Sequence, residues 1–142
     1  MKIVYSTKAT ATGGGRNEGL SHTNDDNLSV KLVTPKEMGG PGGEGTNPEQ
    51  LFAVGYAACF LGALRFVAGK AKVAVGADAS VESSVGLGPR DDGKGFGIDV
   101  ALAVSLPGVE RAVAEDLVAQ AHVVCPYSEA TRGNLNVRLT VV

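Results

Sequence analysis

Alternating apolar and polar residues mark several short segments of this chain as strands. Such a pattern places apolar side chains on one face of a sheet and polar ones on the other. It predicts strands over 28–33, 81–87, 96–106 and 135–141, and less regularly over 3–12. Polar residues predict a loop over 13–27, and turn residues over 88–93 predict an antiparallel hairpin between the flanking strands.

The clearest helix start in the chain follows a glycine-rich stretch. Asn47 is a good N-cap, Pro48 suits the first helical position, and Gln50 stands at the third. Apolar residues then continue with few interruptions, so the pattern predicts a helix over 48–68 that ends at Gly69.

A second helix is predicted over 109–124, where apolar residues form one stripe. It must stop near Cys125, because Pro126 disfavours helical geometry in the residue before it. The order of elements is strands, helix, strands, helix, strand, which predicts an α+β fold with antiparallel sheets around a long central helix. No linker separates two cores, so we expect a single domain over residues 1–142.

The first helix is apolar nearly all round, which needs a separate explanation. Its uncharged apolar run, 51–64, has the length of a buried core helix and is short for a membrane span, so no membrane partner is expected. A helix that is apolar on every side must be covered on every side. One small sheet covers only one face, and we infer that a second subunit covers the rest.

Composition narrows the function classes. The 142 residues carry 13 Lys and Arg against 15 Asp and Glu, a net charge of −2, which lacks the basic character expected of a nucleic-acid-binding protein. The N-terminal residues contain no apolar signal-peptide segment, so a cytoplasmic location is expected. In a reducing compartment, two cysteines are better suited to redox or catalytic work than to a structural disulfide.

Those two cysteines, Cys59 and Cys125, are the main candidates for chemistry. For Cys59 alone, the commonest alternative is a small buried hydrophobic residue in the middle of a helix. A metal site would also use His22 and His122. The sequence has no CxxC or HxxxH spacing, so no metal site is expected. A fixed cysteine within a helix and a mobile one at a helix end suit an attacking and a resolving thiol.

Three motifs together resemble a known family. The stretch from Asn47 to Phe60, which contains Cys59, resembles the peroxidatic-cysteine helix of the organic hydroperoxide resistance proteins of the OsmC/Ohr superfamily. The segment from Cys125 to Asn134 resembles the family's C-terminal cysteine segment, and the stretch from Ala9 to Arg16 resembles its N-terminal strand and arginine loop. The resemblance covers essentially the whole chain in the same order.

The resemblance implies the roles of individual residues. Cys59 would be the peroxidatic cysteine and Cys125 the resolving cysteine, while Arg16 and Glu49 would form a charged pair that activates Cys59. Glu49 and Cys59 are ten residues apart, about 15 Å along one helix. Either Arg16 spans that distance or the Glu49 of a partner subunit comes close in an antiparallel helix pair.

The resemblance also implies the reaction and the assembly. We expect an intertwined homodimer that reduces organic hydroperoxides to alcohols, with no bound cofactor and with dihydrolipoamide, on lipoylated proteins, as reductant. Phe52, Tyr56 and Phe60 are expected to form an apolar substrate pocket that favours alkyl or fatty-acid hydroperoxides. The alternatives are an OsmC-branch peroxidase with another substrate range or reductant and a non-catalytic thiol redox sensor.

Overall fold

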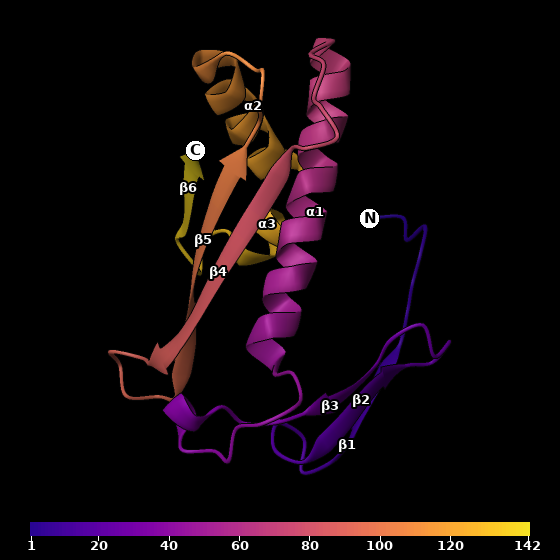
Figure 1. Ribbon diagram of the computed structural model, residues 1–142, viewed down its shortest axis with the longest axis vertical. Helices are drawn as coiled ribbons and strands as arrows, with labels where there is room; N and C mark the ends of the chain where they lie inside the picture. Colours follow the sequence, from indigo (N-terminus) through magenta and orange to yellow (C-terminus); the bar gives the residue numbers. More distant parts are fainter. The chain divides into compact units, whose positions relative to one another are not determined.

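Two three-stranded sheets and three α-helices make up the structure, a computed structural model that describes residues 1–142 (Figure 1). The α+β class and the long helix expected from the sequence are confirmed. The chain divides into two compact units, Met1–Leu51 and Phe52–Val142. The expectation of a single domain stays a prediction.

Helix α1, Pro48–Ala71, begins where the sequence predicts and ends later. The backbone N–H of Gln50 donates to Asn47 Oδ1 at 2.8 Å, which confirms the N-cap. Gly69 does not end the helix, because a glycine within a helix costs only about 1 kcal/mol. The helix ends where Lys72 adopts a left-handed conformation with φ 56° and Val73 N–H donates back to the Ala68 carbonyl.

The sheet of the second unit has the order β4–β5–β6, with β4 at Ser80–Pro89, β5 at Phe96–Ser105 and β6 at Val137–Val141. The predicted antiparallel hairpin of β4 and β5 is confirmed. Strand β6 lies parallel to β5, so the expectation of purely antiparallel sheets is wrong for this strand. Two helices intervene between β5 and β6, and such a crossover returns the chain to the end of the sheet from which β5 starts.

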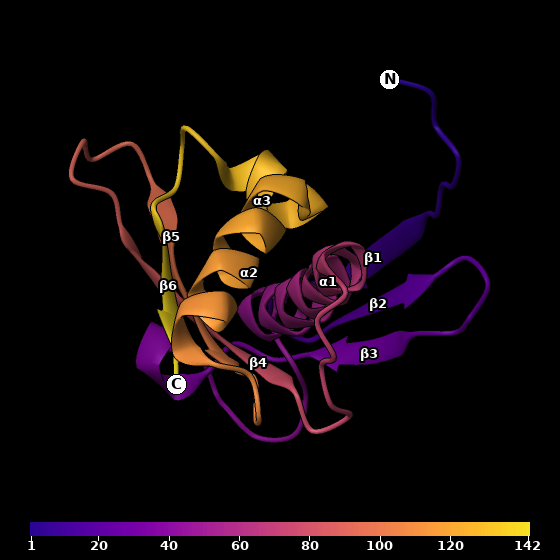
Figure 2. The same cartoon turned by 90° about the horizontal axis from the view of Figure 1, so that it is seen from above.

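The crossover contains helix α2, Arg111–Val124, and helix α3, Pro126–Thr131. Helix α2 ends before Cys125 as predicted, and it starts two residues later than predicted because the Glu110 side chain caps it. The sequence pattern does not predict helix α3, because Pro126 indicates the end of α2; proline is also favourable at the first position of a new helix. Figure 2 shows α1 and α2 on the same face of the β4–β5–β6 sheet.

The core of the second unit lies between these helices and the sheet. Helix α1 contributes one buried stripe, and the inward-facing residues of β5 and α2 complete the cluster. Its fully or nearly fully buried members are Tyr56, Phe60, Leu64, Val67, Ala68, Ala79, Val100, Leu102, Val104, Leu106, Ala114, Leu117, Val118, Ala121 and Cys125. The strict alternation predicted for β5 is confirmed by its buried residues at every second position.

The other faces of α1 are exposed in the single chain. Val54 is 70% and Phe66 is 56% exposed, although both are large and apolar. At 24 residues, the helix is long and apolar enough to cross a membrane by length and composition alone, a test that core helices of soluble proteins also pass. The short apolar run in the sequence therefore does not decide whether α1 is a core helix or a membrane-spanning helix.

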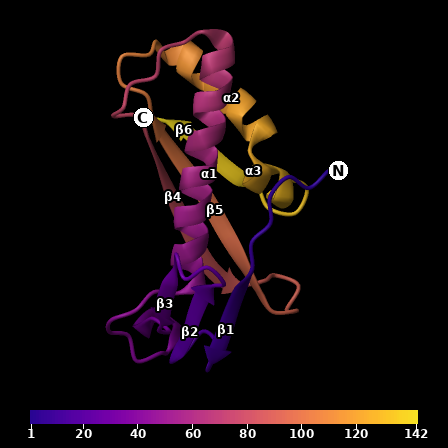
Figure 3. The same ribbon diagram turned by 90° about the vertical axis from the view of Figure 1, so that its right-hand side faces the viewer.

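The first unit contains an antiparallel sheet of β1, Ala9–Gly13, β2, Gly19–Thr23, and β3, Ser29–Leu32, in that order (Figure 3). Strand β1 is shorter than expected, and β2 lies in the segment predicted to be a loop. This error has a clear cause, because Leu20 is the one large apolar residue of β2, so the strand has no apolar alternation to detect. A short 3₁₀ helix, Lys36–Met38, follows the sheet.

Candidate active site

The second unit brings the two cysteines together, which their spacing in the sequence could not show. Cys59 lies in the middle of α1 at the edge of its buried stripe and is partly buried, and Cys125 is fully buried. Their Sγ atoms are 3.6 Å apart, and both thiols are free. A disulfide bond is about 2.05 Å long, so a small movement of either side chain would allow the bond to form.

Cys125 is held by the backbone of two helices at once. It caps the C-terminus of α2, where its N–H donates to the Ala121 carbonyl at 2.9 Å, and it caps the N-terminus of α3, where its carbonyl accepts from Glu129 N–H at 2.9 Å. The residues that follow this cysteine form helix α3, and the expected mobility of Cys125 stays a prediction. The main chain orients its side chain toward Cys59.

The surroundings of Cys59 act on its charge in opposite directions. Burial raises the pKa of the Cys59 thiol, because a thiolate loses solvation away from water. The backbone N–H of Tyr127, which hydrogen-bonds to this sulfur, lowers the same pKa and does not offset the effect of burial. Since the thiolate is the nucleophilic form, Cys59 needs a nearby cation to react rapidly at neutral pH.

A tight turn in the first unit presents Arg16 between β1 and β2. A Cβ atom added to Gly14 would lie 1.9 Å from the Asn17 carbonyl oxygen, so only glycine fits this turn. The Arg16 guanidinium donates to both carboxylate oxygens of Glu49, at 2.7 and 2.8 Å. Arg16 and Glu49 therefore form the charged pair that the resemblance implies, and this two-pronged contact holds Arg16 in one orientation.

Glu49 occupies the first turn of α1, where the helix dipole also favours a negative charge. The hydrogen bonds from Arg16 lower the pKa of Glu49, and those to Glu49 raise the pKa of Arg16. Both groups therefore stay charged over the whole neutral range. The arginine–glutamate pair lies in the first unit and the cysteine pair in the second, and the joint action of the two pairs stays a prediction.

Comparisons with known proteins show which family the chain belongs to. Residues 40–140 match the family model described as OsmC-like protein. The chain belongs to this family. It is 52% identical over 140 residues to an organic hydroperoxide resistance protein of Xanthomonas axonopodis pv. citri, covering 99% of this chain and 96% of the relative.

Solved structures place the chain in the organic hydroperoxide resistance branch of the family. One from Elizabethkingia anophelis has a TM-score of 0.92 at 47% identity and covers 99% of this chain and 98% of its own. That of OhrB from Bacillus subtilis has a TM-score of 0.89 at 42% identity, with 99% and 100% covered. Both agree with the α+β fold and the long helix expected from the sequence.

The three residues expected to form the substrate pocket differ in how deeply they are buried. Tyr56 and Phe60 are fully buried in the core, so their side chains line no open surface. Phe52 is only partly buried, and its ring packs edge-on against Tyr56 and tilted against Tyr127, with centroids 5.8 and 6.0 Å apart. Burial assigns Tyr56 and Phe60 to the core, and the contact of Phe52 with a substrate stays a prediction.

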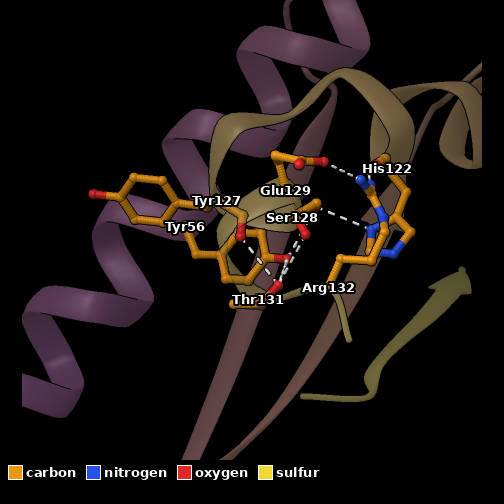
Figure 4. Close-up of polar contacts among 7 residues, drawn as sticks. All are labelled: Tyr56, His122, Tyr127, Ser128, Glu129, Thr131 and Arg132. Atoms are coloured by element: carbon orange, nitrogen blue, oxygen red, sulfur yellow. Dashed lines mark hydrogen bonds and ion pairs between the residues drawn. The ribbon is translucent and has the colours of Figure 1, made fainter. Parts of the chain in front are cut away.

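Three residues near the sulfurs were not selected from the sequence. Tyr127 supplies the N–H on the Cys59 sulfur, and its ring covers Gly55. Ser128 is fully buried and lies between the Tyr56 hydroxyl and the imidazole of His122 (Figure 4). The signal that could have found two of them is their spacing, because His122 and Ser128 are each three residues from Cys125.

Proposed function

We propose that this protein is a thiol-dependent peroxidase that reduces organic hydroperoxides to alcohols. The observation that carries the proposal is the 3.6 Å separation of the Cys59 and Cys125 sulfurs. One sulfur is partly accessible and the other is buried, which suits an attacking and a resolving thiol. The relatives named for organic hydroperoxide resistance support the substrate class.

In the first step, the Cys59 thiolate attacks the distal oxygen of the hydroperoxide. An S–O bond forms, the O–O bond breaks, and the leaving alkoxide takes up a proton to become the alcohol. Cys59 is then a sulfenic acid. The partly buried ring of Phe52, which packs against Tyr127, supports a preference for alkyl or fatty-acid groups over the small polar hydrogen peroxide.

In the second step, the Cys125 thiol attacks the sulfur of the Cys59 sulfenic acid. An S–S bond forms, the S–O bond breaks, and the hydroxyl leaves as water with the proton of Cys125. In the third step, a dihydrolipoyl dithiol, free or on a lipoylated protein, reduces this disulfide by thiol exchange. No bound cofactor is needed for any of the three steps.

Arg16 supplies the positive charge that the first step requires. Burial raises the pKa of Cys59, so a cation must stabilise the thiolate. Glu49 fixes the orientation of the guanidinium, as their two hydrogen bonds support. Glu49 is thus a positioning residue, and Arg16 is the residue that acts on the thiolate.

The active protein is a cytoplasmic homodimer in this proposal. The exposed apolar side chains of α1, Val54 and Phe66 among them, support a second copy of the chain as the group that covers this helix. The two free thiols, one of them partly accessible, suit a reducing compartment.

The experiment that tests the proposal counts turnovers of cumene hydroperoxide with dihydrolipoamide and, separately, with thioredoxin. We expect many turnovers with dihydrolipoamide and few with thioredoxin. Cys59→Ser should abolish peroxide consumption, whereas Cys125→Ser should react once and then stall or become overoxidised. Failure of every dithiol to support turnover would refute the enzyme and leave a redox sensor, and full activity of Cys59→Ser would reverse the two cysteine roles.

A further inference from the structure

Three side chains form a hydrogen-bonded chain behind the two sulfurs. The Tyr56 hydroxyl lies 2.9 Å from Ser128 Oγ, and His122 Nδ1 lies 3.0 Å from the same oxygen. Figure 4 shows Ser128 between these two groups. The Ser128 side chain is fully buried, and the peroxidase reaction described above assigns no role to any of the three residues.

This chain connects the three helices that carry or flank the cysteines. Tyr56 lies on α1 one turn before Cys59, His122 lies in the last turn of α2, and Ser128 lies on α3. Residues three apart on a helix lie on the same side, so the hydrogen bonds run alongside the pair of sulfurs. A movement of the α2–α3 junction away from α1 would break the bond between Tyr56 and Ser128.

The directions of the hydrogen bonds follow from the chemistry of the groups. Burial, and next the charge of Arg132, lower the pKa of His122, so its ring is neutral at neutral pH and Nδ1 can accept. With the ring proton on Nε2, Ser128 donates its one proton to His122 Nδ1 and the Tyr56 hydroxyl donates to Ser128. Arg132 donates to the His122 carbonyl at 2.7 Å and also contacts Glu129, which ties α2 to α3.

We propose that Ser128, held between Tyr56 and His122, is a positioning residue for disulfide formation. It fixes the segment that carries Cys125 against α1, so that the Cys125 sulfur stays within reach of the Cys59 sulfenic acid. This inference rests on the proposed function, because it concerns its second step. The first step needs only Cys59 and its activating cation and does not depend on Ser128.

Competition for the sulfenic acid makes the inference measurable. A sulfenic acid that is not captured by a thiol reacts with a second hydroperoxide to give a sulfinic acid. Loss of the Ser128 hydroxyl should therefore slow disulfide formation by about tenfold, as expected when one buried hydrogen bond is lost. The hydroperoxide concentration that overoxidises half of Cys59 should fall by the same factor.

The experiment follows both oxidation steps of Ser128→Ala by stopped flow and the sulfinic acid by mass spectrometry. The control is Ser83→Ala, because Ser83 also has a buried hydroxyl but no hydrogen-bond partner. We expect the first oxidation rate to be unchanged in both variants and overoxidation to increase only in Ser128→Ala. His122→Asn, which keeps an acceptor for Ser128, should resemble the wild type, and His122→Leu should resemble Ser128→Ala.

Two results would overturn the inference. In one, Ser128→Ala forms the disulfide as fast as the wild type, which leaves the proposed peroxidase intact. In the other, Ser128→Ala slows both oxidation steps equally, which is the behaviour of a purely structural defect. A wild-type protein that forms no disulfide with hydroperoxide would instead refute the proposed function itself, and this inference with it.

Discussion

The reactivity of Cys59 depends on neighbours that come from separate parts of the sequence. Burial in α1 raises its pKa, the Tyr127 N–H lowers it, and the proposed cation is Arg16. Gly55 matters because it leaves room on α1 for the Tyr127 ring. We expect the contact of that ring with the helix to hold Tyr127, and with it the N–H beside the sulfur, in place. A small substitution at Gly55 should therefore change the pKa of the Cys59 thiol indirectly, through Tyr127.

Gly55→Ala tests this link. The added Cβ would lie 3.0 Å from the Tyr127 hydroxyl oxygen and 3.2 to 3.4 Å from its ring carbons, so the ring must shift. We expect the N–H contact to weaken and the pKa of Cys59 to rise, which moves its alkylation-against-pH curve to higher pH in a Cys125→Ser background. Gly69→Ala is the matched control, since a Cβ there meets no atom within 4 Å. An unchanged curve for Gly55→Ala would contradict the link.

The Arg16–Glu49 pair gives stability a defined dependence on pH. The pKa of Glu49 is lowered in the folded chain by its bonds to Arg16, so the unfolded chain binds the proton first as the pH falls. The pair contributes fully to the free energy of unfolding above the pKa of about 4.3 that Glu49 has in the unfolded chain. This contribution is lost as the pH falls through the lowered pKa of the folded chain. The difference in melting temperature between wild type and Glu49→Gln should be constant at neutral pH and shrink in acid. A difference that grows in acid would contradict this assignment.

At the scale of elements, the sequence predicts well wherever one face of an element is buried. Strand β5 and helix α2 each pack one face on the core, and their apolar periodicity therefore predicts them closely. Strand β2 and helix α3 were missed, because β2 has no apolar alternation and α3 is a single short helix. The Cys59–Cys125 contact could not be predicted from spacing, since it depends on how α2 and α3 fold back on α1. Motifs in the sequence identify the candidate residues, whereas Tyr127, Ser128 and His122 become apparent only from the three-dimensional packing around the cysteines.

The start of α1 offers a test of how local sequence defines an element. Asn47→Ala removes the acceptor for Gln50 N–H and should lower the free energy of unfolding by about 1 kcal/mol. Asn47→Asp keeps an acceptor and adds a charge that the helix dipole favours, so it should be close to the wild type. Chemical denaturation of the three proteins measures the effect. Equal losses for both variants would show that the Asn47 oxygen does not cap the helix.

At the scale of the whole molecule, α1 is the unusual feature. It passes one buried stripe through the core of the second unit and leaves large apolar side chains exposed elsewhere. Such surface is unfavourable in water and normally marks an interface. A membrane would also cover it, and so would a second copy of the chain. In the proposed homodimer, the second copy covers it.

Replacing apolar residues on this helix by lysine decides between these possibilities. Val54 and Phe66 are 70% and 56% exposed, so Val54→Lys with Phe66→Lys should leave the core intact and place repelling charges in a dimer interface. We expect the wild type to sediment as a dimer and this double variant as a monomer in analytical ultracentrifugation. Val123→Lys, on the 67% exposed Val123 of α2, should remain dimeric. A dimeric double variant would exclude this face as the interface, and a monomeric wild type that binds lipid vesicles would show that a membrane covers α1.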